Sequence, residues 1–436
     1  MVWSFYRSPT LCQTWTMRKL SALLGLILAA SSLLSIEAHA ASPKSGLSCS
    51  KLNQTISSSG FTYTCMKAGK KLVWSKGVKV PAPLPSPSAS PTRTLSPTPS
   101  LAPTPTPTSA FTPPAIPTSF QDLVAHVDGI KYGAWLKTRE QLKSGGSILG
   151  TVRILIGPNT SPEQPDPLSM LGLTSKLFSD FKQVKNLYLI EFNNQDMQWA
   201  QSQYEIYQDQ KWRSNYSSKA SEQCPTSICN NASSELNNEG DGIILLGVNS
   251  VMDKAQAQKY NPGKSNGTVE SHEYVHTIQI LNSSNSQSQF RYSILPPWLQ
   301  EGQAMWAAQA VVGDTFEKYL KLRAIDYSEL ATMSPSYTPE WISTFLNPNP
   351  TMIENADNWA YWRQWPQYRV YDIGGLVNEI LASIKGPLAV MNIYSDVGSG
   401  STFTDSFKKE FGMAWSEALP FISTAIAAEL SRGINS

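Results

Sequence analysis

The chain has 436 residues, of which 41% are hydrophobic and 16% are charged. This composition excludes wholesale disorder, and the sequence lacks the repeated long apolar stretches of a multi-span membrane protein. The formal net charge is +2, but removing residues 1–40 takes away three basic residues and one acid, which leaves 32 of each sign. A chain with no net charge argues against nucleic acid as its main partner.

The first 40 residues have the layout of an export signal. Arg18 and Lys19 precede a largely apolar run, and Ala38-His39-Ala40 offers the small residues that signal peptidase reads. We expect cleavage after Ala40, and a secreted or cell-surface protein with no membrane span after cleavage. The alternative is an uncleaved single-span anchor, which also places the bulk of the chain outside the cytoplasm.

Four cysteines remain after that cleavage, namely Cys49, Cys65, Cys224 and Cys229. An even number in an oxidising compartment favours disulfides, and proximity pairs Cys49 with Cys65 and Cys224 with Cys229. The sequence alone leaves this connectivity open. A zinc site built from the four thiols is the rival interpretation. It is disfavoured because neither pair has CxxC spacing and no histidine lies near either pair.

Two segments precede the main domain. Residues 42–80 alternate short apolar runs with glycines, a pattern typical of β-hairpins stapled by one disulfide. They resemble short Cys/Trp modules near the N-termini of secreted actinobacterial proteins, which implies a bacterial, actinobacterial source. Their lysines offer a contact with an anionic cell wall, although a solvated basic face is the favoured alternative. Residues 81–118 hold 13 of the 30 prolines and predict an extended, disordered linker.

Residues 119–436 are predicted to form the working domain, a first half with a sheet and a second half of helices. This is an α+β layout. An amphipathic helix is expected from about Phe120 to Leu142, and helical patterns dominate after about residue 268. Strand patterns lie between them, at Ile148–Ile156, Leu187–Phe192 and Gly242–Val248.

The motif that carries chemistry is HExxH, at His272, Glu273 and His276. Residues four apart lie on one face of a helix, so the two imidazoles would project side by side and could hold one Zn²⁺. Glu273 reaches the same side, where it can take a proton from a water that the metal activates. The alternative is a helix with two satisfied surface histidines. A helix is also supported by apolar residues at i, i+4 and i+7, namely Tyr274, Ile278 and Leu281.

A catalytic zinc takes three protein ligands and keeps one open position. The third histidine of the metzincins is absent, and the only other mature histidine, His126, lies far upstream. A carboxylate must therefore serve, and Glu301 stands 25 residues past His276. Pro297 can start a helix that carries Glu301. The small residues Gly302 and Ala304 would let this helix pack close to the HExxH helix.

The segments HEYVH and WLQEGQA together resemble the gluzincin metallopeptidases, specifically the bacterial peptidase MA-like group. The resemblance covers about residues 240–430, including a later helix around Tyr371–Leu381 and spaced phenylalanines near the C-terminus. It implies a zincin-like catalytic domain that hydrolyses peptide or protein substrates with Zn²⁺ and with Glu273 as general base. It also implies that Gly242–Val248 is the sheet edge that aligns an extended peptide.

Several features depart from the better-known gluzincins. The aminopeptidase motif GxMEN is not found, and Met305 stands where the thermolysin type has an aspartate, so no partner is assigned to the histidines. Tyr371 is the candidate to stabilise the oxyanion of the tetrahedral intermediate, with Tyr368 as its weaker rival. A packing role is the alternative for both tyrosines.

Two further segments are interpreted mainly as surface features. The aromatic run Asn358–Trp365 is read as a packed rim patch, with a substrate cleft or sugar stacking as the alternative. The polar segment Gln195–Asn238 is read as a surface insertion. We therefore predict a monomeric, secreted zinc metallopeptidase. The alternative is a non-catalytic protein on a zincin-like fold that binds the cell surface or cell wall.

Overall fold

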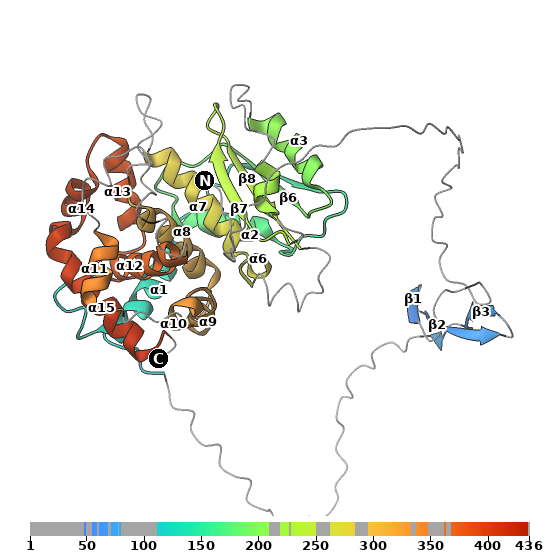
Figure 1. Cartoon of the computed structure of the whole chain (residues 1–436), viewed down its shortest axis with the longest axis horizontal. Coiled ribbons are helices and arrows are strands. Elements are labelled where there is room, and N and C mark those ends of the chain that lie inside the picture. The colour runs from blue at the N-terminus through green and yellow to red at the C-terminus, as the bar shows by residue number, and fades with distance from the viewer. Residues whose placement is uncertain are drawn as a thin grey trace, which may run out of the picture. The chain divides into compact units, whose positions relative to one another are not determined.

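A computed structural model describes residues 48, 55–58, 61–68, 71–76, 78–79, 111–208, 219–225, 228–249, 262–283, 295–332, 337–347, 362 and 368–434. Contacts divide the chain into two compact units (Figure 1). The larger holds Ala110–Ser436, and the smaller lies within Thr10–Ser109. The predicted export signal and residues 81–110 of the predicted linker lie outside the described residues.

The smaller unit contains antiparallel strands, in agreement with the hairpins predicted for residues 42–80. Cys65 is buried and disulfide-bonded. Its predicted partner, Cys49, lies outside the described residues. The central strand pairs with each of the other three; the strands are β1 (Thr55–Ser58), β2 (Phe61–Ala68), β3 (Lys71–Trp74) and β4 (Val78–Lys79).

The first half of the larger unit contains a mixed sheet in the order β5-β6-β8-β7. Three strands run parallel, and the fourth, β7, runs antiparallel to β8. The run Gly242–Gly247 is buried at every position, because helices and loops cover both faces of this part of the sheet. The strands are β5 (Thr151–Ile156), β6 (Asn186–Phe192), β7 (Ala232–Leu236) and β8 (Gly242–Gly247).

The prediction that Gly242–Val248 forms the sheet edge is wrong. This strand is β8, and it lies between β6 and β7. The edge strand is β7, which belongs to the polar segment that the sequence analysis treats as a surface insertion. Its sequence ASSEL escapes strand prediction because buried serines stand where apolar side chains would mark a strand.

The two faces of the sheet have different cores. On one face of the sheet, Leu189 and Ile244 belong to the main core. Tyr274 and Ile278 of the HExxH helix belong to the same core. The other face carries a smaller cluster that includes Tyr204 and the disulfide cysteines. The predicted apolar face of the HExxH helix is therefore confirmed for its first two members, whereas Leu281 is only half-buried.

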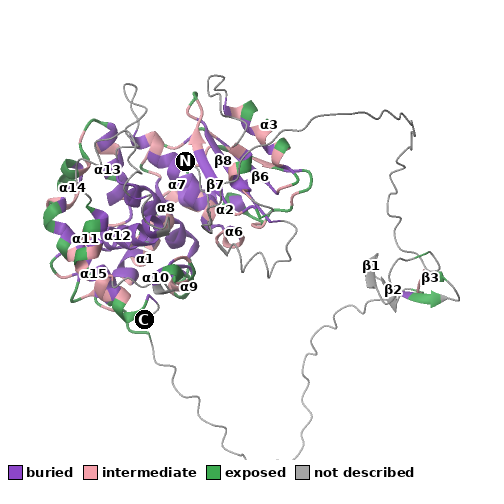
Figure 2. Ribbon diagram, viewed as in Figure 1, coloured by how far each residue is buried: buried purple, intermediate pink, exposed green. Residues whose placement is uncertain are grey.

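The second half of the larger unit is helical, which confirms the predicted α+β layout. In chain order the helices of this unit are α1 (Val127–Ser144), α2 (Pro167–Leu177), α3 (Met197–Gln208), α4 (Lys219–Gln223), α6 (Pro262–Asn266), α7 (Thr268–Ser283), α8 (Pro297–Val312), α9 (Phe316–Asp326), α10 (Ser328–Thr332), α11 (Pro339–Leu346), α12 (Tyr368–Lys385), α13 (Ala389–Gly398), α14 (Phe403–Phe411) and α15 (Trp415–Arg432). Figure 2 shows the burial that runs along α7, α8 and α12.

The N-terminal boundary of the larger unit differs from the predicted residue 119. Phe111 already contacts Tyr132 and Phe316 in a cluster of aromatic rings. The helix predicted from Phe120 begins only at Val127, because Asp122 accepts hydrogen bonds from residues 118 and 119 and holds a turn there.

Glycine permits a close approach between two central helices. A Cβ on Gly302 of α8 would lie 2.1 Å from the carbonyl carbon of Gly374 on α12. The predicted role of Gly302 is thus corrected, since its missing side chain admits α12 and not the HExxH helix. Among the described residues no single helix meets the length and apolarity needed to span a membrane. One pair bent by 102°, Arg369–Lys385 with Ala389–Gly398, meets that test jointly.

Candidate metal centre

The two motif histidines lie side by side on α7, as the four-residue spacing predicts. Their Nε2 atoms are 2.9 Å apart, and both side chains are almost completely buried. The alternative interpretation, two histidines on the protein surface, is therefore excluded by their burial. A helix with 3.6 residues per turn places both rings on the same face, so local structure alone accounts for this pairing.

Glu301 on α8 completes the group. Its Oε2 atom lies 3.3 Å from Nε2 of His272 and 3.0 Å from Nε2 of His276. The three ligand atoms are within 4.8 Å of one another, and Glu301 is fully buried. Four-coordinate ligands at about 2.0–2.1 Å from a metal stand roughly 3.3 Å apart, close to the separations here. The group fits one metal ion.

One carboxylate oxygen of Glu301 also supports a bound metal ion. Its Oε1 atom is buried and has no hydrogen-bond partner among the described residues. A buried carboxylate oxygen without a partner is costly in a protein that holds no cation near it. A metal between the three side chains would compensate this cost.

Mutual electrostatics keep the carboxylate charged. Burial lowers the pKa of His272, outweighing the hydrogen bond to Glu301. Burial acts the same way on His276, but the negative charge of Glu301 prevails and raises the pKa of that imidazole. Burial alone would raise the pKa of Glu301, yet the two histidines lower it to about 2. Glu301 is therefore an anion at any physiological pH.

Gln279 supports His276 from the opposite side of the ring, and the sequence analysis missed it. Its amide nitrogen donates to the carbonyl of Gln300 and to Oε1 of Gln303, so its oxygen must face the histidine. That oxygen lies 2.8 Å from Nδ1 of His276 and can only accept. The proton is thus held on Nδ1, which leaves the Nε2 lone pair for a metal. The i, i+3 spacing from His276 was the available signal.

Glu273 is held by a residue on the edge strand. The hydroxyl of Ser234 on β7 donates a 2.8 Å hydrogen bond to Oε2 of Glu273, and both residues are buried. Ser234 was also missed, because nothing in the sequence ASSEL signals chemistry. The bond fixes the carboxylate of Glu273 on the side of α7 that faces β7.

Tyr371, on α12, lies close to the metal-binding group. Its ring centroid is 6.1 Å from that of His272, and its side chain is buried. The structure thus brings the candidate oxyanion donor beside the histidines. The rival Tyr368 is the first residue of α12, and its side chain lies outside the described part of the chain. His126 stands apart from the metal group, just before α1.

A buried lysine holds the loop that leads into β7. Lys264 donates to the carbonyls of Cys229 and Asn231 and also to that of Gly247 at the end of β8. Burial lowers the pKa of this lysine to about 8, although four nearby glutamates oppose the shift. The ammonium group therefore fastens the loop to the end of β8.

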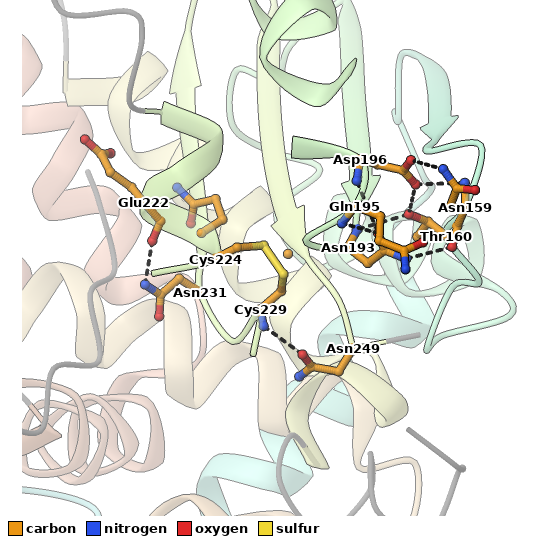
Figure 3. The surroundings of a disulfide bond; sticks show 12 residues. Asn159, Thr160, Asn193, Gln195, Asp196, Glu222, Cys224, Cys229, Asn231 and Asn249 are labelled. Atoms are coloured by element: carbon orange, nitrogen blue, oxygen red, sulfur yellow. Dashed lines mark hydrogen bonds between the residues drawn. A yellow bond between two sulfur atoms is a disulfide. The ribbon is translucent and has the colours of Figure 1, made fainter. Parts of the chain in front are cut away.

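The predicted disulfide Cys224–Cys229 closes the same loop, with an S–S distance of 2.02 Å. Figure 3 shows the hydrogen bond from the backbone nitrogen of Cys229 to the side chain of Asn249, 2.7 Å long. The side chain of Asn231 also donates to the carbonyl of Glu222. These links hold the loop that leads into the edge strand.

A pocket of about 150 Å³ opens beside His272 and Glu273. It lies at the meeting point of β7, α6, α7, α8 and the end of α9. Its lining includes the small or apolar residues Ala232, Val269, Met305 and Ala308, together with the acidic residue Asp326. Of the aromatic run Asn358–Trp365, only Trp362 is described, and it is buried.

Comparison with known proteins finds no matching protein-family model, no matching curated protein and no matching solved structure. A buried His₂Glu group, a neighbouring carboxylate with a fixed orientation and an adjoining pocket together suit metal-assisted hydrolysis.

Proposed function

We propose that this protein is a secreted zinc-dependent peptidase of gluzincin type with a zincin-like catalytic domain. The observation that carries the proposal is the convergence of His272, His276 and Glu301, with Glu273 held next to them. Two neutral imidazoles and one carboxylate form a ligand set that suits zinc and leaves one position open. When bound, zinc would acidify a water and polarise the scissile carbonyl.

In the proposed hydrolysis, each of four side chains has its own role. Glu273 takes the proton of the attacking water and passes it to the leaving amine. Ser234 holds that carboxylate in a single orientation. Gln279 keeps the proton of His276 on Nδ1, away from the metal side of the ring. Tyr371, beside His272, is the candidate donor to the oxyanion.

A peptide substrate is favoured by the edge strand. β7 pairs with β8 on one side, and no strand of the described residues pairs with its other side. An extended peptide can add to such an edge through main-chain hydrogen bonds. Ser234 and Ala232 lie on β7, so the added chain would pass beside Glu273 and the pocket.

The second candidate is a non-catalytic protein on the same fold that binds the cell surface or cell wall, in which residues 42–80 contact an anionic polymer. A metal used only for structure would need no general base. The buried hydrogen bond from Ser234 to Glu273 favours the enzyme, because it orients a carboxylate that takes no part in metal binding.

Metal content tests the proposal first. Elemental mass spectrometry of the purified chain should find about one zinc per molecule. Glu301→Ala should lose it, whereas Glu317→Ala, which removes an exposed glutamate, should keep it. No zinc in the wild type at neutral pH, without chelator, would contradict the metal site.

Hydrolysis is tested separately with Glu273→Gln. This variant should bind zinc as the wild type does but cleave a peptide library at least about 100-fold more slowly, because it lacks the general base. A Glu273→Gln variant that cleaves peptides as fast as the wild type would contradict the role of Glu273 as general base. Zinc binding without cleavage by the wild type would favour the cell-surface binding protein.

A further inference from the structure

The pocket beside the metal group has room for one substrate side chain. Its volume of about 150 Å³ is that of a cavity able to hold a benzene-sized group. His272 and Glu273 form part of its lining, so a side chain in it belongs to a residue that adjoins the scissile bond. The walls near Val269, Met305 and Ala308 offer contact to an apolar stem.

One charged group interrupts these walls. Asp326, the last residue of α9, is half-buried, and its Oδ2 accepts a 2.8 Å hydrogen bond from Nε2 of Gln309. Burial raises the pKa of Asp326 to about 6, so it is still mostly an anion at neutral pH. Among the described residues no lysine or arginine forms an ion pair with it. Within the described part of the chain, Asp326 is thus a partly desolvated anion at the pocket with no basic side chain paired to it.

A second acidic side chain, that of Asp372, lies close enough to Asp326 for their charges to interact. Asp372 on α12 is buried, and its Oδ2 has no hydrogen-bond partner in the described part of the chain. Its pKa is raised well above the ordinary value, first by burial and then by the charges of Asp326 and Glu329, while Arg369 opposes the shift. Repulsion between the two carboxyl groups makes it costly for both to be charged, and a cation bound at Asp326 would lower that cost.

We propose that this pocket selects a lysine or arginine residue next to the scissile bond. The apolar walls take the methylene stem, and Asp326 takes the cationic head. The inference rests on the proposed peptidase function and adds its substrate class. An uncharged side chain of the same length would leave the negative charge of Asp326 without a bound cation, and an acidic side chain would be repelled by it.

Matched peptides test the selection in the zinc-loaded full chain. Two substrates differ only in one residue, lysine or norleucine, at the position that a peptide library identifies as next to the cleaved bond. In wild type, kcat/KM should favour lysine. In Asp326→Asn, which keeps the size and an acceptor for Gln309, the lysine preference should fall roughly 10–100-fold. Asp314→Asn removes an exposed carboxylate and should leave the preference unchanged.

Several outcomes would overturn the inference while leaving the peptidase intact. One is cleavage by the wild type without any preference for lysine or arginine. Another is an equal loss of activity toward both peptides in Asp326→Asn, which would give that carboxylate a structural role only. A third is removal of single N-terminal residues whatever their side chain, because Asp326 would then bind the substrate α-amine.

A binding measurement separates this inference from the proposed function. If the wild type cleaves nothing, the peptidase proposal fails. Titration with n-butylguanidinium, monitored by NMR or calorimetry, then tests whether the pocket binds a cation. Binding to the wild type that Asp326→Asn abolishes supports a cation pocket. Equal binding, or none, in both chains overturns it.

Discussion

The hydroxyl of Ser234 donates a hydrogen bond of 2.8 Å to the carboxylate of Glu273. The bond joins the edge strand β7 to the helix α7, and both residues are buried. It ties the strand proposed to align a peptide to the carboxylate proposed to move the proton. In the proposed mechanism, this bond would fix the position of the substrate strand relative to the general base.

Ser234→Ala should lower kcat about 10-fold and leave KM and zinc content unchanged, because Glu273 loses its orientation but not its carboxylate. The neighbouring Ser233 accepts a hydrogen bond from Gln223 instead. Ser233→Ala is therefore a matched control that should keep kcat. Steady-state kinetics on one peptide decide the matter, and equal kcat values for the two variants would refute the role given to Ser234.

Gln279→Met should weaken zinc binding about 10–100-fold, because Nδ1 of His276 loses the acceptor that fixes its proton. Competition with a chelator measures the affinity. Gln198→Met, a change at an exposed position, should bind zinc like the wild type. A Gln279 variant with unaltered affinity would show that the ring is held by packing alone.

Gly302→Ala should destabilise the protein by about 3 kcal/mol, because the new Cβ would lie 2.1 Å from the backbone of Gly374 and force α8 away from α12. Gly172→Ala makes the same change in α2, where no atom lies within 4 Å of the added Cβ. That variant should be more stable by about 0.5–1 kcal/mol. Denaturant unfolding compares the two, and a neutral Gly302→Ala would contradict the close helix contact.

The preference for lysine over norleucine should weaken as the pH falls through about 6. The pKa of Asp326 in the free protein is raised to about 6, so this carboxylate loses its charge, and its attraction for a cation, below that pH. The pH dependence of kcat/KM reflects ionisations of the free protein. In the ratio of kcat/KM for the two peptides, the ionisations of the metal site cancel because both substrates share them. In Asp326→Asn the ratio should stay flat from pH 5 to about 8; a wild-type ratio that is flat as well would contradict the assignment.

Relations within one helix were readable from the sequence. The spacing of His272 and His276 predicts that their rings share a face, and the structure places their Nε2 atoms 2.9 Å apart. Pro297 likewise predicts the first residue of α8. The pairing of Cys224 with Cys229 followed from their separation of five residues. In each case a fixed helical repeat or a short loop leaves one arrangement.

Relations between elements depended on tertiary structure. The sequence by itself determined that Glu301 is the candidate third ligand, but the packing of α8 on α7 decided that it meets both histidines. Strand order made β7, and not β8, the edge. It thereby placed Ser234 against Glu273 across 39 residues of chain. Only the fold also brought Asp326 into the pocket beside that motif. Spacing along a chain sets positions within one repeat, whereas contacts between helices and strands follow from how their side chains interlock.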